Sequence, residues 1–185
     1  MKKIILLVIF AVPVFTAACS EAPQTTPPEL TALVERAVIE DVFADYYSQF
    51  GPDGKHDFMS FFTKDGVLEV NGLVASGYDE IKALYVQAGA GGEEKPPKAE
   101  GAVPEGVSRM MYTNLDIDLH GDKAVATLLW YSVKSDLLTS PPKITEYGTE
   151  RTELVKQEGR WLISRRVILS EGGMPEGLLE SYPKK

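Results

Sequence analysis

The chain has 185 residues, which is enough for one domain plus a leader segment. Apolar residues make up 44% of it and charged residues 25%, as is ordinary for a globular protein. The formal net charge of −8 disfavours nucleic acid as a partner, because proteins that bind nucleic acid need a basic face. Cys19 is the only cysteine, so no intramolecular disulfide can form.

Residues 1–18 have the pattern of an export signal. Two lysines precede an apolar run, residues 4–15, that is too short for a permanent transmembrane helix. Two alanines then stand directly before Cys19. This junction resembles a bacterial lipobox, although Thr16 stands where leucine is usual, and the resemblance implies that Cys19 is lipidated and becomes the mature N-terminus. The alternative interpretation is an ordinary signal peptide with an incidental cysteine.

Residues 19–29 are predicted to be the lipidated cysteine and a flexible tether, since this stretch is polar, rich in proline and without periodicity. Lipidation implies attachment to the cell envelope, with the domain facing the periplasm. Ser20, rather than an acidic residue, follows the cysteine, and by resemblance to sorted lipoproteins this favours the outer membrane over the inner one. The membrane is therefore expected as a partner through the lipid, because the acidic domain itself is poorly suited to anionic headgroups.

Residues 30–185 are predicted to form one domain that begins with a long helix. Apolar residues recur every four positions along it: Leu30, Val34, Val38, Val42 and Tyr46. This spacing predicts the apolar stripe of an amphipathic helix that runs to about Gln49. A short helix is predicted over residues 56–63, followed by a turn at residues 64–66 and a strand that ends at Asn71-Gly72.

A further helix is predicted over residues 76–89, with Ser76 as its cap. Residues 88–106 are rich in glycine, proline and charge, and predict a loop that is either disordered or a lid. Four long strands then follow, at residues 110–120, 124–136, 144–157 and 160–170. The strand at 124–136 is apolar on both faces, which predicts a place in the middle of the sheet between two layers. Helices followed by an antiparallel meander indicate the α+β class.

Five segments in this order resemble the SnoaL-like branch of the nuclear-transport-factor-2-like superfamily. They are residues 39–50, 58–70, 77–85, 112–126 and 153–167. The resemblance implies a cystatin-like α+β barrel, in which a curved antiparallel sheet wraps around the N-terminal helices and forms a cone with an apolar pocket. It also implies a homodimer formed through the outer face of the sheet.

In the dehydratase-like members of this family a His–Asp dyad abstracts a proton. The resemblance places the aspartate at Gly51 and the histidine at Met110, so neither catalytic group is present. Asp53 is a conceivable substitute for the carboxylate, but nothing replaces the histidine. The favoured hypothesis is therefore a binding or accessory module that needs no cofactor and holds a small, largely apolar ligand. The alternatives are a lyase or isomerase that uses tyrosine, aspartate or arginine, and a module for protein–protein interaction.

The residues expected to line the cone pocket are Tyr46, Met110, Tyr112, Asn114, Trp130 and Arg166. Simple core packing is the alternative for the aromatic ones. Met110, Tyr112 and Asn114 alternate along one strand, which predicts that they share a face. An arginine inside the cone needs a carboxylate, and Asp45 and Glu69 are the candidates. The histidines, His56 and His120, are expected at the surface, and no spacing typical of a metal site is present.

Overall fold

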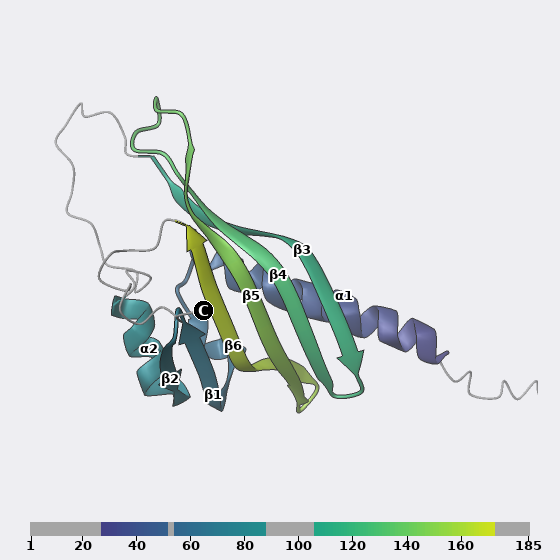
Figure 1. The fold of residues 1–185 in the computed structure, drawn as a ribbon. Helices are drawn as coiled ribbons and strands as arrows, with labels where there is room; N and C mark the ends of the chain where they lie inside the picture. Colours follow the sequence, from purple (N-terminus) through teal and green to yellow (C-terminus); the bar gives the residue numbers. More distant parts are fainter. Residues whose placement is uncertain (1–26, 52–53, 88–105, 173–185) are drawn as a thin grey trace, which may run out of the picture.

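The computed structural model describes residues 27–51, 54–87 and 106–172, and shows helices packed on one face of a curved six-stranded sheet (Figure 1). In chain order the elements are α1 (Pro28–Ser48), the 3₁₀ helix η1 (Phe58–Phe61), β1 (Phe62–Val70), β2 (Leu73–Ser76), α2 (Gly77–Gln87), β3 (Ser108–His120), β4 (Lys123–Lys134), β5 (Lys143–Gln157) and β6 (Arg160–Gly172). The predicted α+β class is confirmed. Residues 1–18, predicted to be a signal peptide, and Cys19, Asp53 and residues 88–105 lie outside the described residues.

The strand order is β2-β1-β6-β5-β4-β3. Neighbouring strands are antiparallel except for β1 and β6, which run parallel. The four long strands form the body of the sheet and α1 crosses it, while α2 lies beside the short strands β1 and β2 (Figure 1). The sheet is thus mainly antiparallel, and its parallel pair is a feature that the order of elements along the chain did not predict.

The inner face of β4 forms part of the core. Its alternate residues Ala124, Ala126, Leu128 and Trp130 are all buried. β4 pairs with β3 on one side and β5 on the other, which confirms its predicted place within the sheet. The second covering layer is not found among the described residues, since Leu129 on the outer face of β4 is exposed.

The apolar stripe predicted for the long helix α1 is buried only toward its C-terminal end, at Val42 and Tyr46, and its first half is exposed. Leu30, Val34 and Val38 are 51%, 53% and 40% exposed, whereas Ile39 is fully buried. Ile39 comes about two and a half helical turns after Leu30, so the two side chains point in opposite directions. The first half of α1 therefore has apolar residues on both sides, and periodicity alone could not determine which side packs on the sheet.

Regular alternation also fails in β3, at a β-bulge. Asn114 has a φ of 54°, and the pairing of β3 with β4 shifts between Thr113 and Asp116. The extra residue turns the following side chains over, so that Tyr112 and Ile117 both contribute to the core side of the sheet although they are an odd number of positions apart. Asn114 itself is exposed, and the prediction that it shares a face with Met110 and Tyr112 is wrong.

The predicted turn at residues 64–66 is a second irregularity within a strand. β1 begins at Phe62 and continues through these residues, and its register with β6 shifts between Phe62 and Val67. Only η1 represents the predicted short helix. Glycine fits closely at position 66, since a Cβ atom would lie 3.0 Å from the Thr63 carbonyl oxygen and 3.1 Å from the Phe62 ring. The predicted turn at Asn71-Gly72 is confirmed, with φ values of 51° and 87°.

Glu35 fastens α1 to the β5–β6 hairpin. Its carboxylate accepts hydrogen bonds from Lys156 Nζ at 2.5 Å and from Trp161 Nε1 at 2.7 Å. These two hydrogen bonds lower the pKa of Glu35 below its ordinary value, because they favour the charged form.

Among the described residues no helix is both long and apolar enough to span a bilayer.

Candidate functional site

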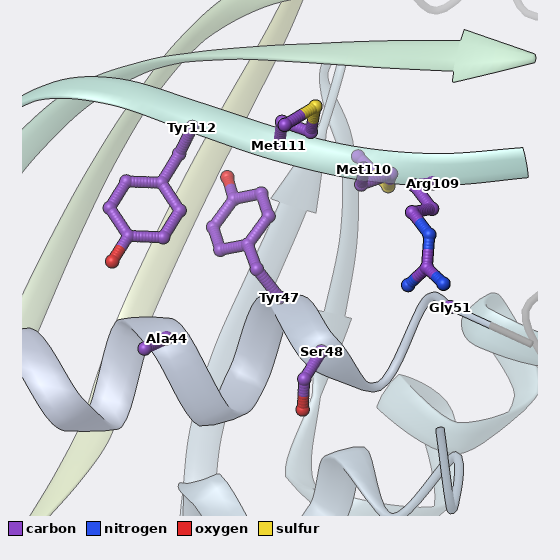
Figure 2. Close-up of a pocket in the computed structure, with 8 residues that line it drawn as sticks. All are labelled: Ala44, Tyr47, Ser48, Gly51, Arg109, Met110, Met111 and Tyr112. Carbon is purple, nitrogen blue, oxygen red and sulfur yellow. The ribbon is translucent and has the colours of Figure 1, made fainter. Parts of the chain in front are cut away.

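A cavity of about 290 Å³ lies between the C-terminal half of α1 and the first half of β3 (Figure 2). Its lining consists of Ala44, Tyr47, Ser48, Gly51, Arg109, Met110, Met111 and Tyr112. The wall is formed largely by the rings of Tyr47 and Tyr112 and the thioether of Met110, whereas the Met111 side chain points away from α1 (Figure 2). The volume is close to the lower end of the range for small-molecule sites in proteins.

The two positions where the family resemblance places the catalytic dyad both border this cavity. Gly51 ends the segment that follows α1, and Met110 lies opposite it on β3. Figure 2 shows the Arg109 guanidinium directed toward Gly51, and a Cβ atom at this glycine would lie 3.0 Å from Arg109 Nη1. The two positions that the resemblance assigns to the dyad therefore lie at one cavity, where a glycine and a thioether stand in place of the acid–base groups.

Tyr47 and Tyr112 form the aromatic part of the wall. Their ring centroids are 4.8 Å apart, and Figure 2 shows the two rings side by side between α1 and β3. Burial raises the pKa of Tyr112, and the nearby carboxylates of Glu40 and Asp41 add to this effect. A half-buried phenol with a raised pKa stays protonated at neutral pH, so Tyr112 can donate a hydrogen bond to a ligand.

The cavity wall has no obvious proton acceptor. Its eight residues include neither a carboxylate nor an imidazole. The Tyr47 hydroxyl donates to Glu150 Oε2 at 2.6 Å, and Ser48 Oγ donates to the Asp45 carbonyl oxygen at 2.6 Å. Burial and the Glu150 carboxylate hold the pKa of Tyr47 well above its ordinary value, so its phenol remains neutral. The arrangement favours holding a molecule over removing a proton from it.

Behind Tyr47 lies a buried ion pair. Arg166 Nη2 donates to Glu150 Oε2 at 2.5 Å and to the Tyr47 hydroxyl at 3.3 Å, and only 1% of the arginine is exposed. Thr152 Oγ1 donates to the other oxygen of Glu150 at 2.6 Å. Burial by itself would lower the pKa of Arg166, but the Glu150 carboxylate together with the phenols of Tyr46, Tyr47 and Tyr85 outweighs burial and raises it. The Arg166 guanidinium is therefore charged in the folded protein.

An aromatic cluster surrounds this pair and fills the interior of the cone. The Arg166 guanidinium carbon lies 3.7 Å from the centroid of the Tyr46 ring, a cation–π distance. The Tyr46 hydroxyl is hydrogen-bonded to that of Tyr85, and burial raises the pKa of both phenols. Two donors of Arg166, Nε and Nη1, have no partner among the described residues.

The structure separates the predicted pocket residues into three groups, and Asn114 alone is exposed and does not line the cavity. Met110 and Tyr112 line the cavity. Tyr46, Trp130 and Arg166 are buried and do not line it, and the Trp130 indole N–H donates to the Thr149 carbonyl oxygen at 3.2 Å. For these three residues the geometry matches the core-packing alternative.

Glu150 is the important residue that the sequence reasoning missed. The partner of Arg166 is Glu150 rather than Asp45 or Glu69, and Glu69 instead pairs with Arg165 at 2.6 Å. Alternation along β5 was the available signal, because Glu150 and Thr152 occupy the same face as the buried Leu154. With the hairpin turn at Glu158-Gly159, that face is paired with Arg166 on β6.

The two histidines lie away from the cavity. His120 is exposed and its Nε2 is 3.0 Å from Asp118, whereas His56 is only partly exposed. In the part of the chain that the structure describes, no group of three or more histidine, cysteine, aspartate or glutamate side chains is placed to hold a metal ion.

Comparison with known proteins identifies the family. The profile of the SnoaL-like domain matches residues 31–167. The chain belongs to the SnoaL-like domain family. The SnoaL-like chain matches no curated protein, but many solved structures resemble it.

Three of these structures share its cystatin-like, nuclear-transport-factor-2-like fold. A protein of unknown function from Mycobacterium tuberculosis is 21% identical, with 83% of this chain and 84% of that chain covered and a TM-score of 0.58. A candidate scytalone dehydratase from Novosphingobium aromaticivorans is 21% identical, with 77% and 87% covered and a TM-score of 0.58. A protein from the same organism, described as similar to nuclear transport factor 2 with a cystatin-like fold, is 18% identical, with 82% and 92% covered and a TM-score of 0.58. At these identities the likeness establishes the fold alone.

The buried ion pair should dominate the stability of the SnoaL-like domain. Glu150→Gln leaves the Arg166 charge buried without its carboxylate, and we expect the free energy of unfolding to fall by about 3–5 kcal/mol. The double variant Glu150→Gln/Arg166→Met removes both charges and should recover a large part of this loss. Urea denaturation monitored by circular dichroism measures both. The predicted role of the ion pair is wrong if Glu150→Gln is as stable as the unsubstituted protein. It is also wrong if the effects of the two substitutions on the free energy of unfolding are additive.

Proposed function

We propose that this SnoaL-like protein binds a small, largely apolar molecule in the cavity between α1 and β3 and does not transform it by acid–base chemistry. The main support for this proposal is that Met110 and Gly51 form part of the cavity wall at the positions where the family resemblance places the His–Asp dyad. Apolar and aromatic surface with a few polar groups is the usual construction of a small-molecule site. The Tyr112 hydroxyl and the Arg109 guanidinium are the polar groups that would orient the ligand.

A lyase or isomerase that uses tyrosine and arginine is the second candidate, and the Tyr47–Glu150–Arg166 set is the observation in its favour. Two features weigh against it. The Tyr47 hydroxyl already donates a hydrogen bond to Glu150, and neither Glu150 nor Arg166 lines the cavity. A substrate in the cavity would meet the ring of Tyr47 rather than a free base, which supports binding over catalysis.

We further propose that the domain is anchored to the cell envelope through lipid on Cys19 and faces the periplasm. The lipobox-like junction before Cys19 supports this. The described domain begins with α1 at Pro28, a short distance after that cysteine, so the tether would allow the domain to move close to the bilayer.

A homodimer formed through the outer face of the sheet is the third part of the proposal. Met111, Leu129 and Tyr147 on three adjacent strands are 45%, 41% and 50% exposed. Met111 and Tyr147 both pair with Tyr131 of β4, so their side chains stand in one row across the sheet. Exposed apolar rows of this kind are typical of a surface that a partner covers.

Filling the cavity should abolish binding of a small aromatic probe. Ala44 is an exposed residue of α1 that borders the cavity, so Ala44→Trp would place an indole in the opening without disturbing the core. We expect 2-naphthol, followed by fluorescence anisotropy, to bind the unsubstituted protein and to lose at least tenfold in affinity with Ala44→Trp. Ala83→Trp, at an exposed position of α2 outside the cavity, is the matched control and should bind normally. Equal affinity in all three proteins would contradict the proposal.

Lipidation can be tested in a bacterial host with the full chain and a Cys19→Ala variant. The unsubstituted protein should fractionate with membranes, be released only by detergent and show an added diacylglyceryl mass on the peptide that begins at Cys19. The variant should lack this mass. A mature protein whose Cys19 thiol is unmodified would instead establish the ordinary signal peptide.

The dimer predicts that a charge on the outer face shifts the oligomeric state. Leu129→Glu should convert the protein to a monomer in light-scattering measurements after gel filtration, because the carboxylate would be buried without a partner. Leu138→Glu, at an exposed position beyond the end of β4, is the control and should leave the mass unchanged. A monomer before any substitution would refute the dimer.

A further inference from the structure

A second cavity, of about 390 Å³, lies beside α2 and shares no residue with the first. Lys55, His56, Asp57 and Phe58 form one side, and Lys82 and Tyr85 of α2 form the other. The proposed function makes no use of this cavity. Its charges and its aromatic wall are unlike those of the cavity beside β3, and they indicate a different kind of ligand.

The apolar part of the wall is a pair of stacked rings. The centroids of Phe58 and Tyr85 are 4.4 Å apart and the rings are within 8° of parallel. Both residues are buried, and the Tyr85 hydroxyl is held by the Tyr46 hydroxyl in the interior of the domain. Tyr85 therefore offers ring surface rather than a hydroxyl to the cavity, which suits a flat apolar body.

The charged part of the wall is positive, although the chain as a whole carries a net charge of −8. Lys55 and Lys82 are exposed, and neither ammonium group has an ion-pair partner within the described ranges. Asp57 is the one carboxylate among the lining residues, so two positive charges face one negative charge. The local potential therefore favours an anion.

His56 adds a hydrogen-bond donor to this cluster. Its φ of 55° is unusual for a residue other than glycine, and its Nδ1 is buried without a hydrogen-bond partner. A buried N–H without an acceptor is costlier than an unused lone pair, so the proton of the neutral imidazole belongs on Nε2. Nε2–H is then the group that remains free to donate.

From these observations we propose that the second cavity binds a small organic anion with a flat, apolar body, such as an aromatic carboxylate. The ring would lie against Phe58 and Tyr85, and the carboxylate would accept hydrogen bonds from Lys55, Lys82 and His56. Asp57 opposes such a ligand, so its removal should strengthen binding. Substitution of a lysine and substitution of Asp57 should therefore change the affinity in opposite directions. This difference distinguishes a ligand-binding charge cluster from lysines that only keep the surface soluble.

The test uses isothermal titration calorimetry of the full chain in a neutral detergent, with benzoate as the probe and benzamide as its uncharged counterpart. Benzoate should bind at least fivefold more tightly than benzamide. Lys82→Gln should weaken benzoate binding about threefold and Asp57→Asn should strengthen it by a similar factor, as expected for partly exposed charges. Lys64→Gln, at an exposed lysine of β1 outside the cavity, is the matched control, and Ala44→Trp reports on the first cavity; both should bind benzoate normally.

The proposal is overturned by the absence of benzoate binding at millimolar concentration, by equal binding of benzoate and benzamide, or by equal losses from Lys82→Gln and Lys64→Gln. Loss of benzoate binding in Ala44→Trp would assign the probe to the first cavity and would likewise refute the second site. Since 2-naphthol tests the first cavity separately, failure of one proposal leaves the other standing.

Discussion

The interior of this domain depends on one buried ion pair. Arg166 of β6 and Glu150 of β5 are both almost inaccessible, and each charge can be tolerated there only because the other is 2.5 Å away. The phenol of Tyr47, the hydroxyl of Thr152 and the ring face of Tyr46 supply the remaining contacts. These groups and the surrounding aromatic rings fill the middle of the cone, and neither Glu150 nor Arg166 lines the cavity beside β3.

Tyr47 connects the ion pair to that cavity. Its ring forms part of the cavity wall beside Tyr112, while its hydroxyl is fixed by Glu150. A wall residue that is held from behind keeps one rotamer, so a ligand that packs on it loses less side-chain entropy on binding. The buried charges therefore fix the orientation of one residue of the cavity wall without lining the cavity themselves.

The sequence predicted the elements better than it predicted their local register. Alternation placed the core face of β4 correctly, and turn residues located the hairpins at Asn71-Gly72 and Glu158-Gly159. The bulge at Asn114 was missed because asparagine reads as an ordinary strand position unless its positive φ is known. For α1, apolar residues on two opposite sides left the buried side undetermined, since which one packs depends on the tertiary structure.

In the candidate site, too, some features were predictable from the sequence and others were not. The family resemblance brought Gly51 and Met110 together, although they are far apart in the sequence, and the structure places both at one cavity. It gave no information on Glu150, because a buried carboxylate in a strand has the same local pattern as an exposed one. Thr152 pairs with Arg166 across the β5–β6 hairpin. Glu150 lies two positions before Thr152 on the same face, so this pairing places it diagonally opposite the arginine.

The replacement at the dyad positions also has a physical consequence for what the cavity can hold. A histidine and an aspartate in a half-buried wall must be satisfied by each other or by a polar ligand, whereas a thioether and a glycine leave no polar group to satisfy. Met110 in particular is flexible and polarizable, and it can adapt its contacts to apolar molecules of different shape. Met110 and Gly51 thus make this part of the cavity wall apolar and leave it without a side chain that could accept a proton.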